Sequence, residues 1–410
     1  MARTKAELGT GARLSDFMSA SLLARVFPAE SVAACLDKHG RNTQRLRSFP
    51  ATAGVYYCMA LSLYPEAAYS AVFSVITSGL AWAAGEPSGH TIAKSSISAL
   101  RSKIGFEPLQ DLMDKHCVPL ADPKAQPEAF FAGLRIVAMD GSNFELPDEA
   151  ANVEAFGYPG SRTGHAGYPQ AQCAVLVECT THAVLGACIG PYATEEFKLC
   201  KGLLPKLDAS MLCLADRGFR GHSRWVQARA TGAHLLWRAS TTQILAVQTV
   251  LPDNSFLSQL VPGKGSRQER RSQAVTVRVI DYELPNAQGQ MTAYRLVTSL
   301  LDPDVAPANE LAKLYHARWQ VEAVFDEMKT HLRHSRRVLR SKTPDLVRQE
   351  FFGWVLAHFA VRWLLHQGVS RYKLNHAEQS FTAHLNILRA AQPQSGAFSP
   401  KAPKKKAALV

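Results

Sequence analysis

The sequence has no long uninterrupted apolar run. Its most apolar stretch, residues 71–84, is interrupted by Ser74, Ser78 and Gly79 and is too short to span a bilayer. The first residues, Met-Ala-Arg-Thr-Lys, contain no apolar leader of the kind that directs export. We therefore expect neither a membrane segment nor secretion.

Cysteine is present, but not in the spacing of a disulfide or metal framework. None of the eight cysteines belongs to a CxxC pair. Cys179, His182 and Cys188 could be taken for zinc ligands, yet the apolar segments around them are typical of two buried strands. Reduced core thiols in a cytosolic protein are the better interpretation.

Acidic residues are few compared with basic ones. The chain has 34 Asp and Glu against 46 Lys and Arg, which gives a net charge of +12 and a pI near 9.4. Such an excess indicates a polyanionic partner, most often nucleic acid and less often an anionic membrane surface. The basic residues form two clusters, Lys264, Arg267, Arg270 and Arg271 in one, and Lys329, Arg333, Arg336, Arg337, Arg340 and Lys342 in the other.

A chain of 410 residues exceeds one typical core, so we expect two or three structural units. No internal repeat is found. The residue patterns predict an α/β protein with, in chain order, a helical region over 1–130, a core over 131–231 and 305–375, a β-rich insertion over 232–304, and a segment over 376–410 that ends in a disordered basic tail.

Two short apolar runs each end in an aspartate. Residues 134–139 lead into Asp140, and residues 211–215 lead into Asp216. Both runs predict strands, with further strands near 172–178 and 183–189 and a helix across 195–206. An aspartate after a strand is often only a turn former or a helix cap. Two of them in one sheet would present a pair of carboxylates.

The segment from Tyr315 to Lys329 has the spacing Tyr-x2-Arg-x3-Glu-x6-Lys. In one continuous helix, Tyr315, Arg318, Glu322 and Lys329 would share a face opposite an apolar stripe. A carboxylate flanked by two cations suits metal-assisted chemistry on a phosphate backbone. The alternative is a surface helix with ordinary ion pairs.

Asp140, Asp216 and Glu322 could be united only by folding. Three carboxylates could supply oxygen ligands for two Mg²⁺ ions, for which Mn²⁺ can substitute, with water and phosphate completing the coordination. Two such ions can activate a water or a 3′-hydroxyl and stabilise the leaving oxygen in an in-line displacement at phosphorus.

On these motifs the chain resembles the IS4 family of DDE transposases over residues 134–340. The matching stretches are Ala138–Asp148, Tyr168-Pro-Gln, Leu214–Phe219 with its Asp-Arg-Gly-Phe, and the Tyr/Arg/Glu/Lys signature. The resemblance implies an RNase H-like core interrupted by a β-rich insertion, with an N-terminal DNA-binding region. It also implies that Asp140, Asp216 and Glu322 bind the catalytic metals, while Tyr315, Arg318 and Lys329 contact DNA near the transposon end.

In some relatives an aromatic residue of the insertion holds a flipped base while a DNA hairpin forms. Tyr294, in Tyr-Arg-Leu-Val-Thr-Ser, stands where those relatives carry tryptophan, and Trp237 is a weaker candidate. The alternative for Tyr294 is a strand residue packed on its neighbours.

The resemblance predicts a Mg²⁺-dependent transposase that cuts and joins DNA at the inverted-repeat ends of its element. Its partners would be the double-stranded transposon ends, the target DNA and a second copy in a synaptic homodimer, in the bacterial cytoplasm at the nucleoid. The alternatives are an RNase H-like nuclease without strand transfer and a non-catalytic DNA-binding regulator. The complete Asp/Asp/Glu set argues against the regulator.

Overall fold

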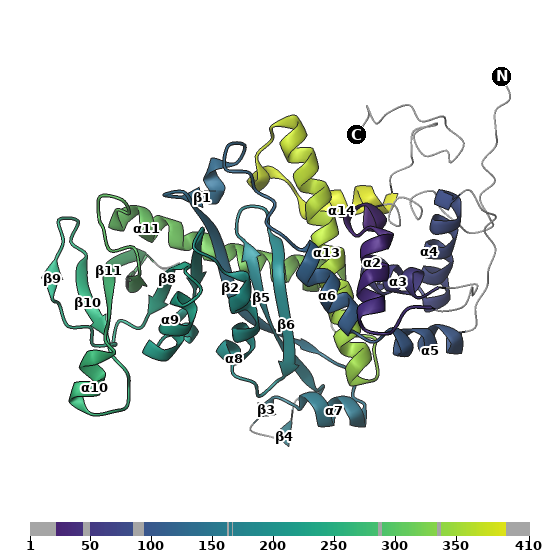
Figure 1. Ribbon diagram of the computed structural model, residues 1–410, viewed down its shortest axis with the longest axis horizontal. Helices are drawn as coiled ribbons and strands as arrows, with labels where there is room; N and C mark the ends of the chain where they lie inside the picture. The colour runs from purple at the N-terminus through teal and green to yellow at the C-terminus, as the bar shows by residue number, and fades with distance from the viewer. Residues whose placement is uncertain are drawn as a thin grey trace. The chain divides into compact units, whose positions relative to one another are not determined.

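The protein is described here by a computed structural model, which covers residues 22–43, 50–84, 94–161, 164–165, 167–285, 289–333 and 338–390. The predicted basic tail, Arg336 and Arg337 lie outside these residues. The chain divides into two compact units (Figure 1). Unit 1 comprises Met1–Val118, Phe144–Gln170 and Asp326–Val410, and unit 2 comprises Pro119–Asn143 and Ala171–Phe325. This division separates the predicted core segment 305–375 into two parts.

Unit 1 is mainly helical. Its helices are α2 (Ala29–Lys38), α3 (Ala51–Leu63), α4 (Tyr69–Ala84), α5 (Lys94–Ile104), α6 (Glu107–His116), α7 (Ala150–Phe156), the π-helix η5 (Glu327–Leu332), α13 (Pro344–Tyr372), the 3₁₀ helix η6 (His376–Glu378) and α14 (Phe381–Ala390). The strands β3 (Gly160–Ser161) and β4 (Gly164–His165) form a separate pair. None of the described helices is long and apolar enough to cross a membrane.

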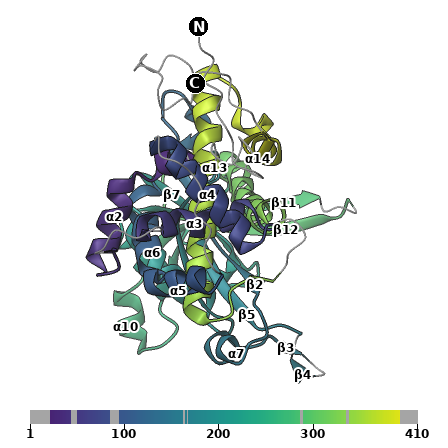
Figure 2. The ribbon, with the colours of Figure 1, turned by 90° about the vertical axis from the view of Figure 1, so that its right-hand side faces the viewer.

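Helices α3 and α13 form the centre of unit 1, side by side in Figure 2. Nearly every residue of α3 is buried, as expected for a helix that is apolar all round. Gly353 allows the close approach, because a Cβ there would lie 2.7 Å from the carbonyl oxygen of Cys58. Helix α3 of the N-terminal region therefore shares one core with α13.

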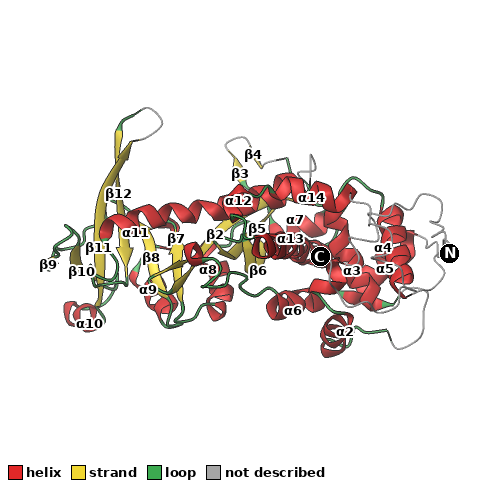
Figure 3. Cartoon of the chain, turned by 90° about the horizontal axis from the view of Figure 1, so that it is seen from above, coloured by secondary structure: helices red, strands yellow, loops and turns green. Residues whose placement is uncertain are grey.

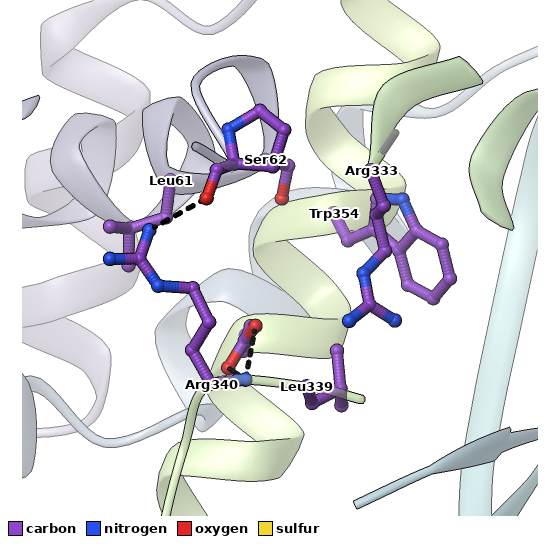
Figure 4. A pocket seen from close by; sticks show the side chains of 8 residues that line it. Leu61, Ser62, Arg333, Leu339, Arg340 and Trp354 are labelled. Atoms are coloured by element: carbon purple, nitrogen blue, oxygen red, sulfur yellow. Dashed lines mark hydrogen bonds between the residues drawn. The ribbon is translucent and has the colours of Figure 1, made fainter. Parts of the chain in front are cut away.

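The second basic cluster is partly structural. Figure 4 shows a small pocket in unit 1 lined by Leu61, Ser62, Arg333, Leu339, Arg340 and Trp354. The Arg340 guanidinium donates to the carbonyl oxygens of Pro65 at 3.5 Å and Ala67 at 3.0 Å, and its backbone N–H donates to Glu350 at 3.0 Å. Arg340 therefore ties the loop after α3 to α13 within unit 1.

Unit 2 contains most of a ten-stranded sheet. Its strands are β1 (Phe130–Phe131), β2 (Leu134–Glu145), β5 (Gln170–Glu178), β6 (Ala183–Pro191), β7 (Met211–Ala215), β8 (His234–Ala239), β9 (Thr249–Val250), β10 (Phe256–Leu260), β11 (Val275–Pro285) and β12 (Met291–Thr298). The order is β6-β5-β2-β7-β8-β12-β11-β10-β9, with β1 on β2. Strand β7 pairs in parallel with both β2 and β8, whereas β5 and β6 and the pairs among β8 to β12 are antiparallel.

The helices of unit 2 are short. They are η1 (Pro127–Ala129), α8 (Glu196–Cys200), η2 (Lys201–Lys206), η3 (Arg217–Phe219), α9 (His222–Arg229), α10 (Arg267–Ser272), α11 (Ala308–Tyr315), η4 (His316–Trp319) and α12 (Gln320–Asp326). The last residue of α12, Asp326, begins the last segment of unit 1. The predicted α/β class, with a helical N-terminal region and a β-rich insertion, is confirmed. The predicted single helix over 195–206 is instead α8 followed by the 3₁₀ helix η2.

The insertion extends the core sheet. Strand β8, which begins the predicted insertion, continues the parallel part of the sheet beside β7, and β12, β11, β10 and β9 follow. Strand β12 pairs with β8 only from Arg295 to Thr298, and β11 with β10 only from Val275 to Val279. The remaining parts of β11 and β12 pair only with each other and project as a two-stranded hairpin (Figure 3).

A buried arginine connects the insertion to the segment before α11. Arg278 on β11 is fully buried and donates to the Ala306 carbonyl at 2.6 Å and Ser255 Oγ at 2.7 Å, and it forms an ion pair with Asp253. Asp253 also accepts a hydrogen bond from the backbone N–H of Ala308, the first residue of α11, at 2.9 Å. A buried charge is stable only when paired in this way, so the insertion fixes where α11 begins.

In unit 1 the π-helix η5 is anchored by a buried charge network. Glu327 accepts hydrogen bonds from His358 Nε2 at 2.9 Å and Arg362 Nε at 2.8 Å. All three side chains are buried, and burial lowers the pKa of His358 to about 3, so that this imidazole is neutral.

Replacing Glu327 with alanine should destabilise unit 1 by about 3–5 kcal/mol, because the Arg362 guanidinium would stay buried without its carboxylate. Urea unfolding followed by helical circular dichroism measures the loss. The control, Lys342→Ala, opens the exposed pair of Lys342 with Glu149 and should cost less than about 1 kcal/mol. Equal losses in the two variants would show that the network contributes no more than a surface ion pair.

Candidate active site

Asp140 and Asp216 are brought together by strand register. Strands β2 and β7 pair in parallel from Arg135 and Met211 to Ala138 and Leu214. The same register, continued for two residues, places Asp140 beside Asp216. The charge on Asp216 contributes to raising the pKa of Asp140, although burial of Asp140 is the larger cause.

Each aspartate also makes a local hydrogen bond. Asp140 Oδ1 accepts from the Gly141 N–H at 2.9 Å, and Asp216 Oδ1 accepts from the Gly218 N–H at 2.7 Å, which caps η3. The capping role considered as an alternative is therefore present at Asp216. The prediction that Asp140 ends its strand is wrong, because β2 continues to Glu145 after its pairing with β7 has ended.

Arg318 connects Asp140 to Glu322. One terminal guanidinium nitrogen lies 2.9 Å from Asp140 Oδ2 and the other lies 3.1 Å from Glu322 Oε1. The Arg318 side chain is only 10% exposed, whereas that of Glu322 is 44% exposed. The guanidinium thus offsets the negative charges of two of the three predicted metal ligands at once. The helical pattern did not predict this bridging role.

The signature segment is not one continuous α-helix, so the prediction of a single polar face is wrong. Helix α11 ends at Tyr315, a 3₁₀ turn follows, α12 begins at Gln320, and η5 is a π-helix. Tyr315, the last residue of α11, is buried. Its hydroxyl donates to the Ala215 carbonyl oxygen at 3.2 Å, and burial raises its pKa well above the ordinary value.

Tyr315 therefore supports the end of β7 immediately before Asp216. Its side chain is buried, and a direct contact between this side chain and DNA stays a prediction that its burial does not support. Lys329 is half-buried in η5 of unit 1, and its contact with DNA likewise stays a prediction.

On the insertion, Tyr294 packs against its neighbours, as the alternative interpretation expected. Its ring stacks on Tyr282 with centroids 5.4 Å apart, and the Arg238 guanidinium lies 4.5 Å from the Tyr294 centroid. Tyr282 and Tyr294 are directly opposite each other on β11 and β12. Trp237 is buried, so it is a core residue and no candidate for base stacking.

Three residues of the first basic cluster, Arg267, Arg270 and Arg271, lie on the solvated helix α10, and Lys264 precedes it. Ser266 and Glu269 make a reciprocal capping box that begins α10, and no residue of this helix is buried. Arg270 Nε donates to the Pro262 carbonyl at 2.9 Å. Lys264, Arg267, Arg270 and Arg271 are all exposed, as a surface for a polyanion requires.

Two residues at the site were missed by sequence reasoning. Glu196, the first residue of α8, shares a hydrogen bond with Asp140; burial and the charges of Asp140 and Asp216 raise its pKa to about 7. Trp319 is 56% exposed, and the Arg318 guanidinium lies 5.5 Å from its ring. Nothing in the local pattern marks Glu196, whereas Trp319 stands inside the signature.

The donor set fits a hard divalent cation, because it consists of carboxylate oxygens. No group of three or more His, Cys, Asp or Glu side chains within the described ranges is arranged closely enough to hold an ion. Arg318 lies between Asp140 and Glu322 instead, as the positive charge that these carboxylates share. Metal binding would therefore require this guanidinium to move.

Comparison with known proteins identifies the family of the chain. The family described as insertion element 4 transposase N-terminal matches residues 18–114, and the transposase DDE domain matches residues 132–360. The chain is 26% identical, over 85% of its length and 75% of the relative, to transposase InsG for insertion sequence element IS4 of Escherichia coli K12. It is 22% identical to the putative transposase InsZ of the same organism, over 60% of this chain and 79% of that one.

A solved structure of piggyBac transposase, in a synaptic complex with hairpin DNA, aligns with 96% of this chain and 82% of its own at 11% identity. Its TM-score is 0.44, which is too low for this similarity to inform the description of the site. The DDE-domain match, in contrast, spans more than half of the chain and contains Asp140, Asp216 and Glu322. The protein therefore belongs to the IS4 family of DDE transposases, DNA-cleaving and DNA-joining enzymes that generally use divalent metal ions.

Proposed function

We propose that this transposase cuts and rejoins DNA at the inverted-repeat ends of its element, as a homodimer in the synaptic complex. Asp140, Asp216 and Glu322 would hold two Mg²⁺ ions, or Mn²⁺ in their place. The observation that carries the proposal is the juxtaposition of Asp140 and Asp216 on neighbouring parallel strands, with Arg318 linking Asp140 to Glu322.

Two ions bound there would supply charge stabilisation for both the attacking and the leaving oxygen in an in-line displacement at phosphorus. The chain's own residues orient this chemistry. Strands β2 and β7 present Asp140 and Asp216 from a rigid sheet, and Tyr315 fixes the end of β7 through its bond to Ala215. Glu322 lies on α12, and its side chain is more exposed than that of Arg318.

Arg318 would change partners during the reaction. In the structure its guanidinium neutralises Asp140 and Glu322. With its charge no longer needed by these carboxylates, the guanidinium would be able to pair with a phosphate oxygen of DNA, an interaction for which its planar fork is suited. This exchange reconciles the ion pairs of Arg318 with the DNA contact that the resemblance implies.

Replacing Asp140 with Asn, Asp216 with Asn, or Glu322 with Gln should each lower the rate of end cleavage by about a thousandfold or more, since several kcal/mol of transition-state stabilisation depend on the ions. Affinity for end DNA, measured by gel shift, should change little. Asp208→Asn, at the opposite end of β7, is the matched control and should cleave normally. A single active-site variant with near-normal cleavage would remove that residue from the ligand set.

The same assay separates the proposed transposase from a nuclease. Cleaved ends with a free 3′-hydroxyl should join to a second, labelled DNA when Mg²⁺ is present. Cleavage without any joined product would favour the nuclease, and end binding without cleavage would favour the regulator.

The exposed cluster on and before α10 is proposed to bind phosphates. Reversing Lys264 and Arg267 to Glu should weaken end binding and reduce the slope of log affinity against log salt by about 0.9 for each phosphate that is no longer neutralised. Lys124→Glu with Lys313→Glu changes net charge equally outside the cluster and should have a smaller effect. Identical salt slopes in the wild type and both variants would exclude the cluster from the interface.

Tyr294 is proposed to hold an unstacked base if cleavage passes through a DNA hairpin, where an aromatic platform recovers about 1–3 kcal/mol per base. Tyr294→Ala should slow hairpin formation or resolution more than first-strand nicking, and Tyr294→Trp should be tolerated. Tyr372→Ala, at an exposed tyrosine of unit 1, serves as the control. Equal losses in nicking and hairpin steps would assign Tyr294 a packing role only.

A further inference from the structure

The turn between β5 and β6 contacts the helix that carries Glu322. We propose that His182, in this turn, is a positioning residue for Glu322, because it holds the first residue of α12. The contact joins residues that are 138 positions apart: His182 Nε2 lies 2.6 Å from Gln320 Oε1, and Gln320 begins α12. The inference rests on the proposed function of Glu322, which follows two residues later in the same helix.

A buried carboxylate holds this turn in place. Glu178, the last residue of β5, is fully buried and accepts hydrogen bonds from the backbone N–H groups of Leu120 and Ala121, both at 3.0 Å. It also forms an ion pair with Arg135 of β2 and accepts a hydrogen bond from the Thr181 hydroxyl, inside the turn. Movement of the turn would leave a buried charge without some of these partners, so the turn is a rigid support.

His182 has a backbone conformation that few side chains favour. Its φ is +58°, in the left-handed region, and its backbone N–H donates to the Glu178 carbonyl oxygen at 2.9 Å to close the turn. Glycine would adopt this conformation without strain. The turn itself therefore does not require the imidazole, and the contact of the imidazole with Gln320 lies outside the turn. Because the Gln320 amide oxygen can only accept, Nε2 carries the hydrogen and donates it.

The winding of the signature segment changes at Gln320. The 3₁₀ turn η4 ends and α12 begins there, and such a change within a helical segment often marks a hinge. Arg318, just before this junction, binds Asp140 and Glu322 through its side chain. The attachment of Gln320 to a rigid turn restrains the backbone of α12 as well, independently of those ion pairs.

Hydrogen exchange of the α12 amides in the metal-free chain tests the contact. His182→Gly removes the imidazole and keeps the turn, and it should speed this exchange about two- to tenfold, the equilibrium effect of one hydrogen bond. His182→Gln, whose side-chain amide can donate to Gln320, should restore slow exchange. Ala132→Gly, at another residue with positive φ in the turn between β1 and β2, is the matched control and should leave exchange in α12 unchanged.

A double variant shows whether the two side chains act together. His182→Gly and Gln320→Ala should each speed exchange in α12. Combined in one chain, they should have no larger effect than the stronger single change, because both remove the same contact. Multiplied effects in the double variant would overturn the proposal, since the two side chains would then act separately.

First-strand nicking of end DNA connects the contact to Glu322. His182→Gly should lower the nicking rate about two- to tenfold, with the affinity for end DNA and the melting temperature unchanged, and His182→Gln should recover the rate. Faster exchange in α12 without slower nicking would overturn the positioning role of His182. Normal nicking by Glu322→Gln would instead overturn the proposed function of Glu322, so the two failures are distinguishable.

Discussion

The mutual repulsion of half-buried carboxylates is the constraint around which this site is organised. Asp140 lies on β2, Asp216 directly follows the neighbouring strand β7, and Glu196 shares a hydrogen bond with Asp140. Arg318 offsets part of the repulsion by binding Asp140 and Glu322 together. The same guanidinium therefore lies between two of the carboxylates that are proposed to bind metal.

The surrounding scaffold holds these charges in place by satisfying buried polar groups. The Tyr315 hydroxyl donates a hydrogen bond to the Ala215 carbonyl oxygen. The ion pair of Arg278 with Asp253 fixes the beginning of α11. Both interactions bind the signature segment to the sheet. The insertion is consequently more than an appendage to the core, since its strands continue the core sheet and determine where the signature segment begins.

Much of the fold followed from local patterns. The apolar runs before Asp140 and Asp216 are buried parallel strands, as a sheet covered on both faces requires. The β-rich character of residues 232–304 was also correct. The continuous signature helix failed because the pattern assumed uniform 100° turns, whereas a 3₁₀ turn and a π-helix flank α12.

The sequence by itself determined which residues are proposed to carry the chemistry: Asp140, Asp216 and Glu322 stand in motifs whose local composition makes them recognisable. Tertiary structure decided what each of them touches. Arg318 and Asp140 are 178 positions apart, and Tyr315 and Ala215 are 100 apart. Such pairings depend on strand register and on the winding of a distant helix, which no local pattern encodes. Glu196 joined the site for the same reason, because only the packed backbone shows that Gly141 and Gly218 make room for it.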